Sequence, residues 1–126
     1  MFGGEIIRKK IKVKIESIEE KTNEKYEVFS IINKNKITYK KDEVKYTLII
    51  SENSITLIRE SEDFKNILTF KEKRSILSEY IIKSNDMVLE INVETLSLKN
   101  TSKEIYIEYK IKETDALHKY KITMEE

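Results

Sequence analysis

Arg59 is the side chain whose position says most about chemistry in this sequence of 126 residues. It shares one phase of an alternating run with Ile55 and Leu57, so a guanidinium falls on a face that is otherwise apolar. An arginine at the end of an apolar cavity can hold a carboxylate or a phosphate through two parallel hydrogen bonds. Four tyrosines fall on the apolar phase of other runs and could add hydroxyl groups to that cavity: Tyr46, Tyr80, Tyr109 and Tyr120. The alternative is that the tyrosines fill a core and that Arg59 bends into water.

His118 is the single histidine, and it shares a phase with Tyr120 and Ile122 in the last run. It could therefore face the same cavity and contact a ligand there. A nucleophilic site would need a hydroxyl, a carboxylate and an oxyanion hole around it, and no nucleophile-elbow pattern accompanies this histidine. The chain has no Cys, which excludes disulfides, thiol nucleophiles and Cys-ligated zinc. We expect no catalytic residue, no metal and no cofactor, and hence a protein that is not an enzyme.

A row of cations offers a second kind of chemistry, the binding of RNA or another polyanion. The cations on the polar phase of the first and last runs are Arg8, Lys10, Lys12, Lys14, Lys119 and Lys121. If these two runs pair, the six residues form one basic stripe, beside which Phe29 and Tyr106 could stack on bases. The alternative is lysines that keep a strand soluble and are offset by local glutamates. The formal net charge of +1 gives no general attraction to nucleic acid.

The elements that carry these residues are β-strands, because apolar and polar residues alternate along most of the chain. The alternation is clearest in residues 7–15, 44–50 and 105–111, which are rich in β-branched and aromatic side chains. Short polar clusters separate the runs, and their Asn and Asp residues can adopt the left-handed conformations that Gly would otherwise supply. The spacing of these turns predicts about ten strands with little or no helix. A slip of phase between Thr95 and Leu96 predicts a β-bulge.

The fold class that follows is all-β, with a single antiparallel up-and-down barrel of roughly eight to ten strands. Closure removes the two exposed edges of an open sheet, and residues 118–125 are expected to pair with the first strand. A two-sheet sandwich has the same sequence signature and is the rival architecture. The length fits one domain over residues 1–126. Because the first residues lack the apolar run of a signal peptide and no segment predicts a membrane span, we expect a soluble cytoplasmic protein.

Four segments carry a resemblance to a known family: NKITY at 35–39, the hairpin at 48–59, LTF at 68–70 and the long alternating run at 89–98. In these segments the sequence resembles the YwiB-like family, a bacterial domain of unknown function with a calycin-like, lipocalin-shaped β-barrel. The family usually has Gly soon after the arginine of the hairpin, whereas Glu60 and Ser61 follow Arg59 here. The resemblance implies a calycin-like barrel and assigns no catalytic residue. The Gly-x-Trp motif of secreted lipocalins is missing, because the chain has no Trp.

The function that these residues favour is that of a non-catalytic intracellular barrel that binds a small apolar or amphipathic ligand. Arg59, the four tyrosines and His118 would supply its polar contacts. Binding of RNA or another polyanion through the basic stripe is the alternative. A structural or interaction role for a barrel with a filled core is the third hypothesis, and the oligomeric state does not follow from the sequence.

Overall fold

The computed structural model describes residues 6–18 and 21–124, and within these ranges every regular element is a β-strand. In chain order the strands are β1 (Ile6–Ser17), β2 (Thr22–Asn33), β3 (Lys36–Lys41), β4 (Val44–Ile50), β5 (Ile55–Glu60), β6 (Phe64–Phe70), β7 (Ser75–Ile82), β8 (Met87–Asn100), β9 (Glu104–Ile111) and β10 (Ala116–Met124). Each strand pairs antiparallel with the next, and β10 pairs with β1 to close the barrel. The predicted antiparallel barrel is therefore confirmed, and the rival sandwich is wrong.

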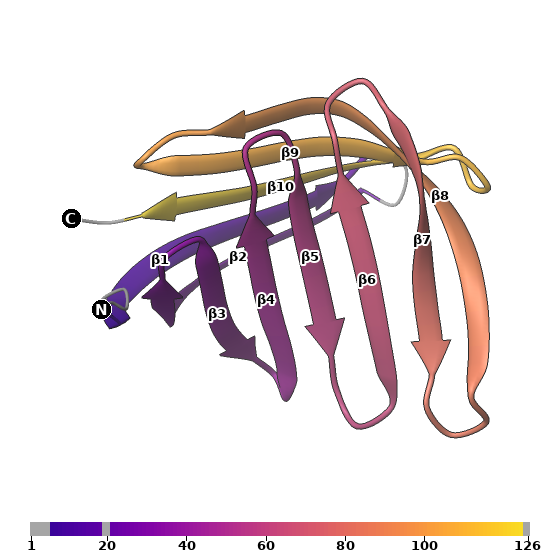
Figure 1. Ribbon diagram of the computed structural model, residues 1–126, viewed down its shortest axis with the longest axis horizontal. Helices are drawn as coiled ribbons and strands as arrows, with labels where there is room; N and C mark the ends of the chain where they lie inside the picture. The colour runs from indigo at the N-terminus through magenta and orange to yellow at the C-terminus, as the bar shows by residue number, and fades with distance from the viewer. Residues whose placement is uncertain (1–5, 19–20, 125–126) are drawn as a thin grey trace.

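The closing pair of strands joins the two ends of the chain. Ile11 lies opposite Met124, and Ser17 lies opposite His118. β10 begins at Ala116, two residues before the predicted start, and the predicted end at Glu125 lies outside the described residues. Figure 1 shows β3 to β7 side by side at the front, with β9, β10, β1 and β2 behind them at a steep angle. β8 bends from the first group of strands into the second.

The centre of the barrel is filled by its own side chains. Ile11, Leu48, Phe70, Ile105 and Ile122 are all 0% exposed and belong to one continuous cluster of buried residues. These residues sit at alternate positions of their strands, which is why the alternation in the sequence predicts the inner face. Burying each of them contributes about 1.5–3 kcal/mol, so the apolar inner face stabilises the closed sheet.

Several tight turns depend on residues in left-handed conformations. Among the described residues with positive φ are Lys21, Lys34, Asp42, Glu43, Lys73, Asp86 and Asp115, none of which is Gly. The prediction that Asp replaces Gly in turns is confirmed at three of these positions, whereas the use of Lys and Glu was not predicted. Asp42 and Glu43 are consecutive, with φ of 51° and 66°, and they connect the paired residues Lys41 and Val44. Two successive positive φ values are the mark of a type I′ hairpin turn.

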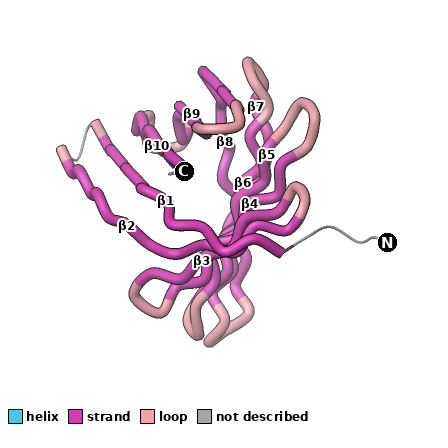
Figure 2. The backbone as a smooth tube through the Cα atoms, turned by 90° about the vertical axis from the view of Figure 1, so that its left-hand side faces the viewer, coloured by secondary structure: helices cyan, strands magenta, loops and turns pink. Residues whose placement is uncertain are grey.

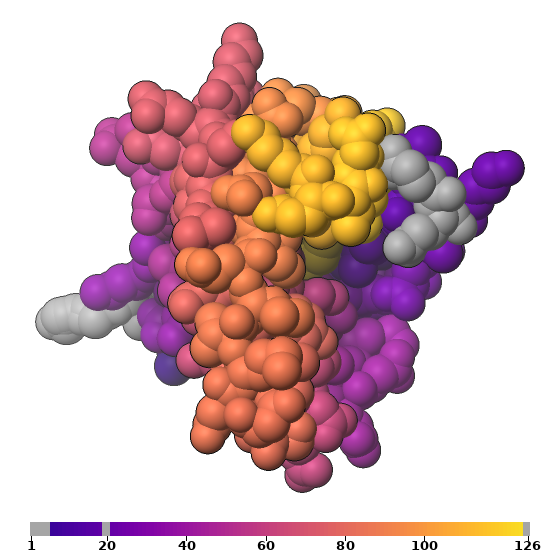
Figure 3. Space-filling view, turned by 90° about the vertical axis from the view of Figure 1, so that its right-hand side faces the viewer, coloured from indigo at the N-terminus to yellow at the C-terminus, as the bar shows by residue number. Residues whose placement is uncertain are grey.

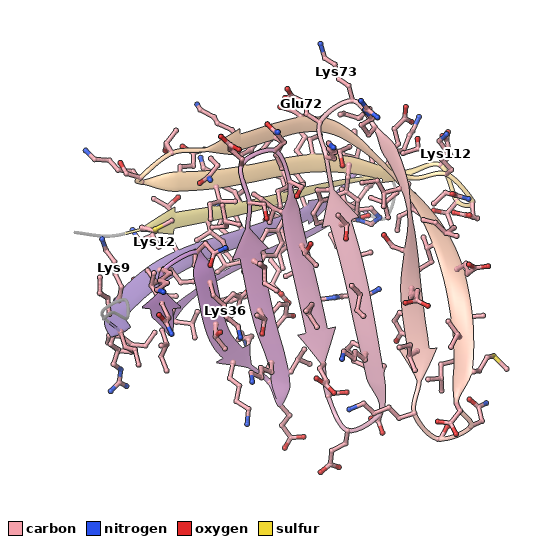
Figure 4. The ribbon with its side chains drawn as sticks, in the orientation of Figure 1. Lys9, Lys12, Lys36, Glu72, Lys73 and Lys112 are labelled. Carbon is pink, nitrogen blue, oxygen red and sulfur yellow. The ribbon has the colours of Figure 1, made fainter. Side chains whose placement is uncertain are left out.

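A β-bulge bends the long strand β8 where the sequence predicts one, with a shift of register between Thr95 and Ser97. The turn between β6 and β7 covers this bulge. Lys73 N–H donates to the Thr95 carbonyl (2.9 Å), and Thr95 N–H donates to the Arg74 carbonyl (3.0 Å). The Glu72 carboxylate accepts a hydrogen bond from Leu98 N–H (3.2 Å), and Figure 4 shows Glu72 and Lys73 at this turn beside β8. The bend is therefore fixed by two backbone hydrogen bonds and one side-chain hydrogen bond from a neighbouring hairpin.

Strand pairing is incomplete at two places around the barrel. β2 and β3 share only the pairs Ile31–Thr38, Ile32–Ile37 and Asn33–Lys36, so the longer part of β2 has no register with β3. The register of β8 with β9 begins at Val93, so residues 87–92 of β8 extend beyond β9 with β7 beside them. The β7–β8 hairpin consequently projects from the barrel (Figure 1). Its inner face is the surface on which the candidate site lies.

Candidate ligand-binding site

Arg59 lies in a cross-strand row on the inner face of the sheet. Register pairs Tyr46 with Arg59, Arg59 with Asn66, Asn66 with Tyr80, and Tyr80 with Leu89. The row thus crosses β4, β5, β6, β7 and β8, and its two ends differ in burial. Tyr46 is buried at 8% exposure, whereas Leu89 is 45% exposed. The row leads from the filled centre of the barrel to the projecting β7–β8 hairpin.

Asn66 holds the guanidinium of Arg59 in place. Its Oδ1 accepts hydrogen bonds from Arg59 Nε (3.3 Å) and Nη2 (2.9 Å), and its Nδ2 donates to the Glu79 carbonyl (3.1 Å). Asn66 is 2% exposed, so the amide is fixed between two strands. A guanidinium has five N–H donors, and two of them bind Asn66, which leaves three for another acceptor. The sequence analysis did not predict a role for Asn66. Its place between Phe64 and Leu68 on the apolar phase nevertheless indicates a buried polar residue.

Apolar side chains surround this cation on the exposed side. The Phe64 ring lies 5.9 Å from Arg59 Cζ and stacks on the Tyr80 ring at a centroid distance of 5.4 Å. Both aromatic residues are half-buried, and the inward positions of β8 beyond them carry Leu89 and Met87, which are 45% and 47% exposed. We call Arg59, Phe64, Tyr80, Met87 and Leu89 the open-end surface. Figure 3 shows the orange β7–β8 hairpin projecting below the yellow residues of the C-terminal part of the chain.

Tyrosine hydroxyls form a buried chain in the centre of the barrel. Tyr39 Oη shares a hydrogen bond with Tyr26 Oη (3.0 Å) and another with Tyr120 Oη, and the Tyr39 ring stacks on Tyr46 at 4.7 Å. Burial, which disfavours the phenolate, raises the pKa of Tyr26, Tyr39 and Tyr120 above the ordinary value. Tyr46 and Tyr120, predicted as ligand contacts, therefore lie in the core in this structure. The sequence analysis did not predict that Tyr26 and Tyr39 point inward. Tyr26 nevertheless shares the apolar phase with Val28, and Tyr39 shares it with Ile37.

Tyr109 and His118 form a stacked pair on β9 and β10. The two rings lie 5.1 Å apart at an angle of 22°, and Tyr109 also packs against Phe70 at 4.8 Å. Burial raises the pKa of Tyr109, and the positive charge of Arg59 opposes that rise. Arg59 thus acts electrostatically on Tyr109. The structure brings Arg59, Tyr46 and Tyr80 into one row and holds His118 against Tyr109.

The predicted basic stripe lies on the outer face, where carboxylates offset part of its charge. Register places Lys14 opposite Lys121 and Lys12 opposite Thr123, so the first and last strands do bring their cations together. Ion pairs join Lys10 to Glu27 (3.3 Å), Lys14 to Glu16 (3.1 Å) and Lys121 to Glu104 (3.6 Å). Lys12, on β1 in Figure 4, is part of this row.

The aromatic side chains predicted to accompany the stripe are only partly available. Phe29 is 57% exposed, with the Arg8 guanidinium 5.0 Å above its ring. The Tyr106 hydroxyl donates to Glu108 (3.0 Å), and burial together with this carboxylate raises the pKa of Tyr106 to about 12. Arg8 therefore covers one of the two aromatic rings on which bases could stack.

Two hollows open on the outer surface beside β2, away from Arg59. One, of about 400 Å³, is lined by residues of β1, β2 and β10 that include Lys14, Lys25 and Lys121. The other, of about 550 Å³, lies where β2 and β3 diverge and is lined by residues that include Phe29 and Lys45. Residues 6–18 and 21–124 contain no cluster of three or more acidic, His or Cys side chains that could hold a metal ion. The same part of the chain has no helix long and apolar enough to cross a membrane.

The closed antiparallel sheet defines the class of protein, an up-and-down β-barrel, and this is the fold that the sequence resemblance predicts. Residues 6–124 match the family described as "Domain of unknown function (DUF1934)", and the chain belongs to this family. The chain is also similar to the crystal structure of the ywiB protein from Bacillus subtilis, with 20% sequence identity and a TM-score of 0.67. That match covers 95% of this chain and 94% of the other, and it establishes the likeness of fold. No curated protein matches the chain in sequence.

Proposed function

We propose that this protein is a non-catalytic binding protein for a small amphipathic anion, which it holds on the open-end surface. The observation that carries the proposal is the placement of Arg59. Its charge lies on an inner face whose row neighbours are Tyr46, Asn66, Tyr80 and Leu89, all of them uncharged. Within residues 6–18 and 21–124 no carboxylate forms an ion pair with Arg59. An anionic head group would compensate this charge.

The geometry favours a head group that accepts more than one hydrogen bond. Asn66 fixes the guanidinium, so little side-chain entropy is lost when a carboxylate or phosphate binds the three remaining donors. Phe64, Tyr80 and Leu89 would then cover the apolar part of the ligand, and each 100 Å² of apolar surface removed from water contributes about 2.5 kcal/mol. The ligand would lie at the open end, because the centre of the barrel is filled by the core.

A fluorescent fatty acid tests this proposal by direct titration. The wild type should bind it, and Arg59→Met should weaken binding by about 1.5–3 kcal/mol, or roughly 10- to 150-fold, the usual contribution of a charge-assisted hydrogen bond. A neutral analogue with the same tail should bind both proteins equally. Arg74→Met, an equal change of charge in the exposed β6–β7 turn, is the matched control. The absence of binding to the wild type, or equal binding to the Arg59 variant, would contradict the proposal.

The polyanion alternative has weaker support. Glu27, Glu16 and Glu104 each lie within 3.6 Å of a lysine of the stripe, so part of its charge is already compensated. Binding of RNA would require these ion pairs to compete with phosphates. The hollow that contains Lys14, Lys25 and Lys121 is the place where such binding would begin. The third hypothesis, a structural or interaction role for a filled barrel, agrees with the packed core and predicts no ligand at Arg59.

A further inference from the structure

β2 has a strand neighbour on only one side over most of its length. All its residues from Thr22 to Asn33 have partners in β1, whereas register with β3 is limited to Ile31, Ile32 and Asn33. Figure 2 shows the part of β2 before these residues at the outer rim of the barrel, away from the β3–β4 hairpin. In the portion of the chain that the structure describes, residues 22–30 pair with no strand besides β1. Their outward N–H and C=O groups are a template for another strand.

The sequence of this edge, TNEKYEVFS, is complementary to itself under two-fold symmetry. If two copies pair antiparallel with the axis at Tyr26, Lys25 of each copy lies opposite Glu27 of the other. These side chains are on the outer face of the sheet, so the pairing forms two cross-strand pairs of opposite charge. Such pairs stabilise neighbouring strands, and a two-fold axis repeats each of them.

Other two-fold registers lack this complementarity. When a two-fold axis perpendicular to the sheet relates two antiparallel strands, each side chain stays on its own face and one residue lies opposite its own copy at the axis. Each alternative register therefore places a different residue at the axis. An axis at Lys25 places two lysines opposite each other, and an axis at Glu27 places two glutamates opposite each other. Like charges in directly opposite positions are destabilising. The register centred on Tyr26 is therefore the one that the charges favour.

Among residues 6–18 and 21–124, Lys25 has a like charge as its cross-strand neighbour. Its register partner in β1 is Lys14, a like charge, and no described carboxylate forms an ion pair with Lys25. Glu27 from a second copy would supply that partner. Glu27 itself lies opposite Lys12 and 3.3 Å from Lys10, so its carboxylate is already held on the outer face. Placing Lys25 opposite Lys14 is unfavourable within one copy, and an added strand that brings Glu27 opposite Lys25 would offset this repulsion.

We propose that two copies of this chain associate through their β2 edges, antiparallel and centred on Tyr26, into one continuous sheet. The two outer hollows adjoin this edge, one at Lys25 and Glu27 and the other at Phe29 and Ile31. The exposed Phe29 (57%) and Ile31 (51%) lie on the outer face and gain cover when the sheets join. The interface leaves Arg59 outside it, so it is independent of ligand binding at the open end.

Compensating charge swaps test the register by sedimentation velocity on the full chain. The wild type should be a dimer that dissociates on dilution. Lys25→Glu or Glu27→Lys alone should raise the dimer Kd at least about ten-fold, because each replaces two attractive pairs by two repulsive ones. The double swap should restore the Kd to within about three-fold of the wild-type value, because opposite charges face each other again. Lys71→Glu, in the exposed β6–β7 turn, is the control for net charge.

A monomer at every concentration would overturn the proposal, as would a dimer whose Kd the single swaps leave unchanged. A double swap that dissociates as easily as the single ones would also overturn it, since its charges are complementary only in this register. Circular dichroism checks that each variant folds. Lys25→Glu should fold, because the new carboxylate lies opposite Lys14.

An engineered disulfide gives a second, geometric readout, since the natural chain has no Cys. Opposite residues of antiparallel strands have Cα atoms about 5 Å apart, within the reach of a disulfide. Tyr26→Cys should therefore form a covalent dimer under mild oxidation. Thr22→Cys should not, because its counterpart would lie about 27 Å away in the same register. Equal cross-linking of the two variants would contradict the placement of the axis.

Discussion

At the scale of single residues, Asn66→Asp tests the role of Arg59 without changing Arg59 itself. A carboxylate at this position would lie against the guanidinium and neutralise the charge that the proposed ligand needs. We expect fatty-acid affinity to fall at least about ten-fold, similar to the effect of Arg59→Met. The variant also loses the donor to the Glu79 carbonyl, so its free energy of unfolding in urea should fall by about 1–2 kcal/mol.

The control for this experiment is Asn53→Asp, an identical change in the exposed β4–β5 turn. It should alter neither affinity nor stability by a measurable amount. If Asn66→Asp unfolds at the expected urea concentration but binds the fatty acid as well as the wild type, Arg59 does not contact the head group.

The contact between Asn66 and Arg59 could be predicted from the sequence only in part. The inward position of Arg59 follows from its phase with Ile55 and Leu57, because alternate residues of a strand share one face. Its hydrogen bond to Asn66 does not follow from that pattern. The contact requires the register of β5 with β6, and this register depends on the turn at residues 61–63. The same limit explains why Tyr46 and Tyr120 were predicted as ligand contacts: phase separates inside from outside, but it does not separate a filled centre from an open end.

At the scale of elements, alternation predicts strands well and predicts their pairing less well. The ten strands and the bulge at Thr95 follow from local pattern, whereas the closing pair of β1 with β10 follows from the need to cover two sheet edges. The short register between β2 and β3 does not, because the alternation does not specify how many residues of two neighbouring strands pair. Turn chemistry was predicted in part: Asp42, Asp86 and Asp115 have positive φ as expected, while Glu43 adopts a conformation usually reserved for Gly.

Glu43→Gly should therefore stabilise the protein. Glu43 has φ of 66° in the β3–β4 turn, where its Cβ crowds the backbone, and Asp-Gly is a preferred sequence for a type I′ turn. Removing this strain should increase the free energy of unfolding by about 0.5–1 kcal/mol, measured by urea denaturation. Glu52→Gly, in a turn position without positive φ, should instead be neutral or destabilising. A loss of stability in the Glu43 variant would show that its side chain makes a contact worth more than the strain.

At the scale of the whole molecule, buried tyrosines connect strands that are far apart in the sequence. The hydroxyl chain joins Tyr26 of β2 to Tyr39 of β3 and Tyr120 of β10, so it exists only when the barrel is closed. The apolar phase of each strand predicts that these rings point inward. Their meeting could not be predicted, because it depends on which strands lie across the barrel from one another. The hydroxyl chain gives the core a polar centre without charge at neutral pH, because the ordinary pKa of tyrosine is near 10. Burial raises the pKa of each of these hydroxyls further.

This arrangement predicts how stability depends on pH. The pKa values of Tyr26, Tyr39, Tyr109 and Tyr120 are raised in the folded state, so the unfolded chain loses these protons first as pH rises past about 10. The stabilisation from these groups is complete below pH 10 and falls above it, by about 1.4 kcal/mol per pH unit for each tyrosine. Phenolate absorbance should then rise together with unfolding, measured by circular dichroism across the alkaline range.

Tyr39→Phe should lower the free energy of unfolding at neutral pH, because it leaves two hydroxyls without their shared partner. It should also make the fall of this free energy with alkaline pH less steep, by about the contribution of one tyrosine. Gradual ionisation of all seven tyrosines near pH 10 in a protein that stays folded would contradict the buried hydroxyl chain.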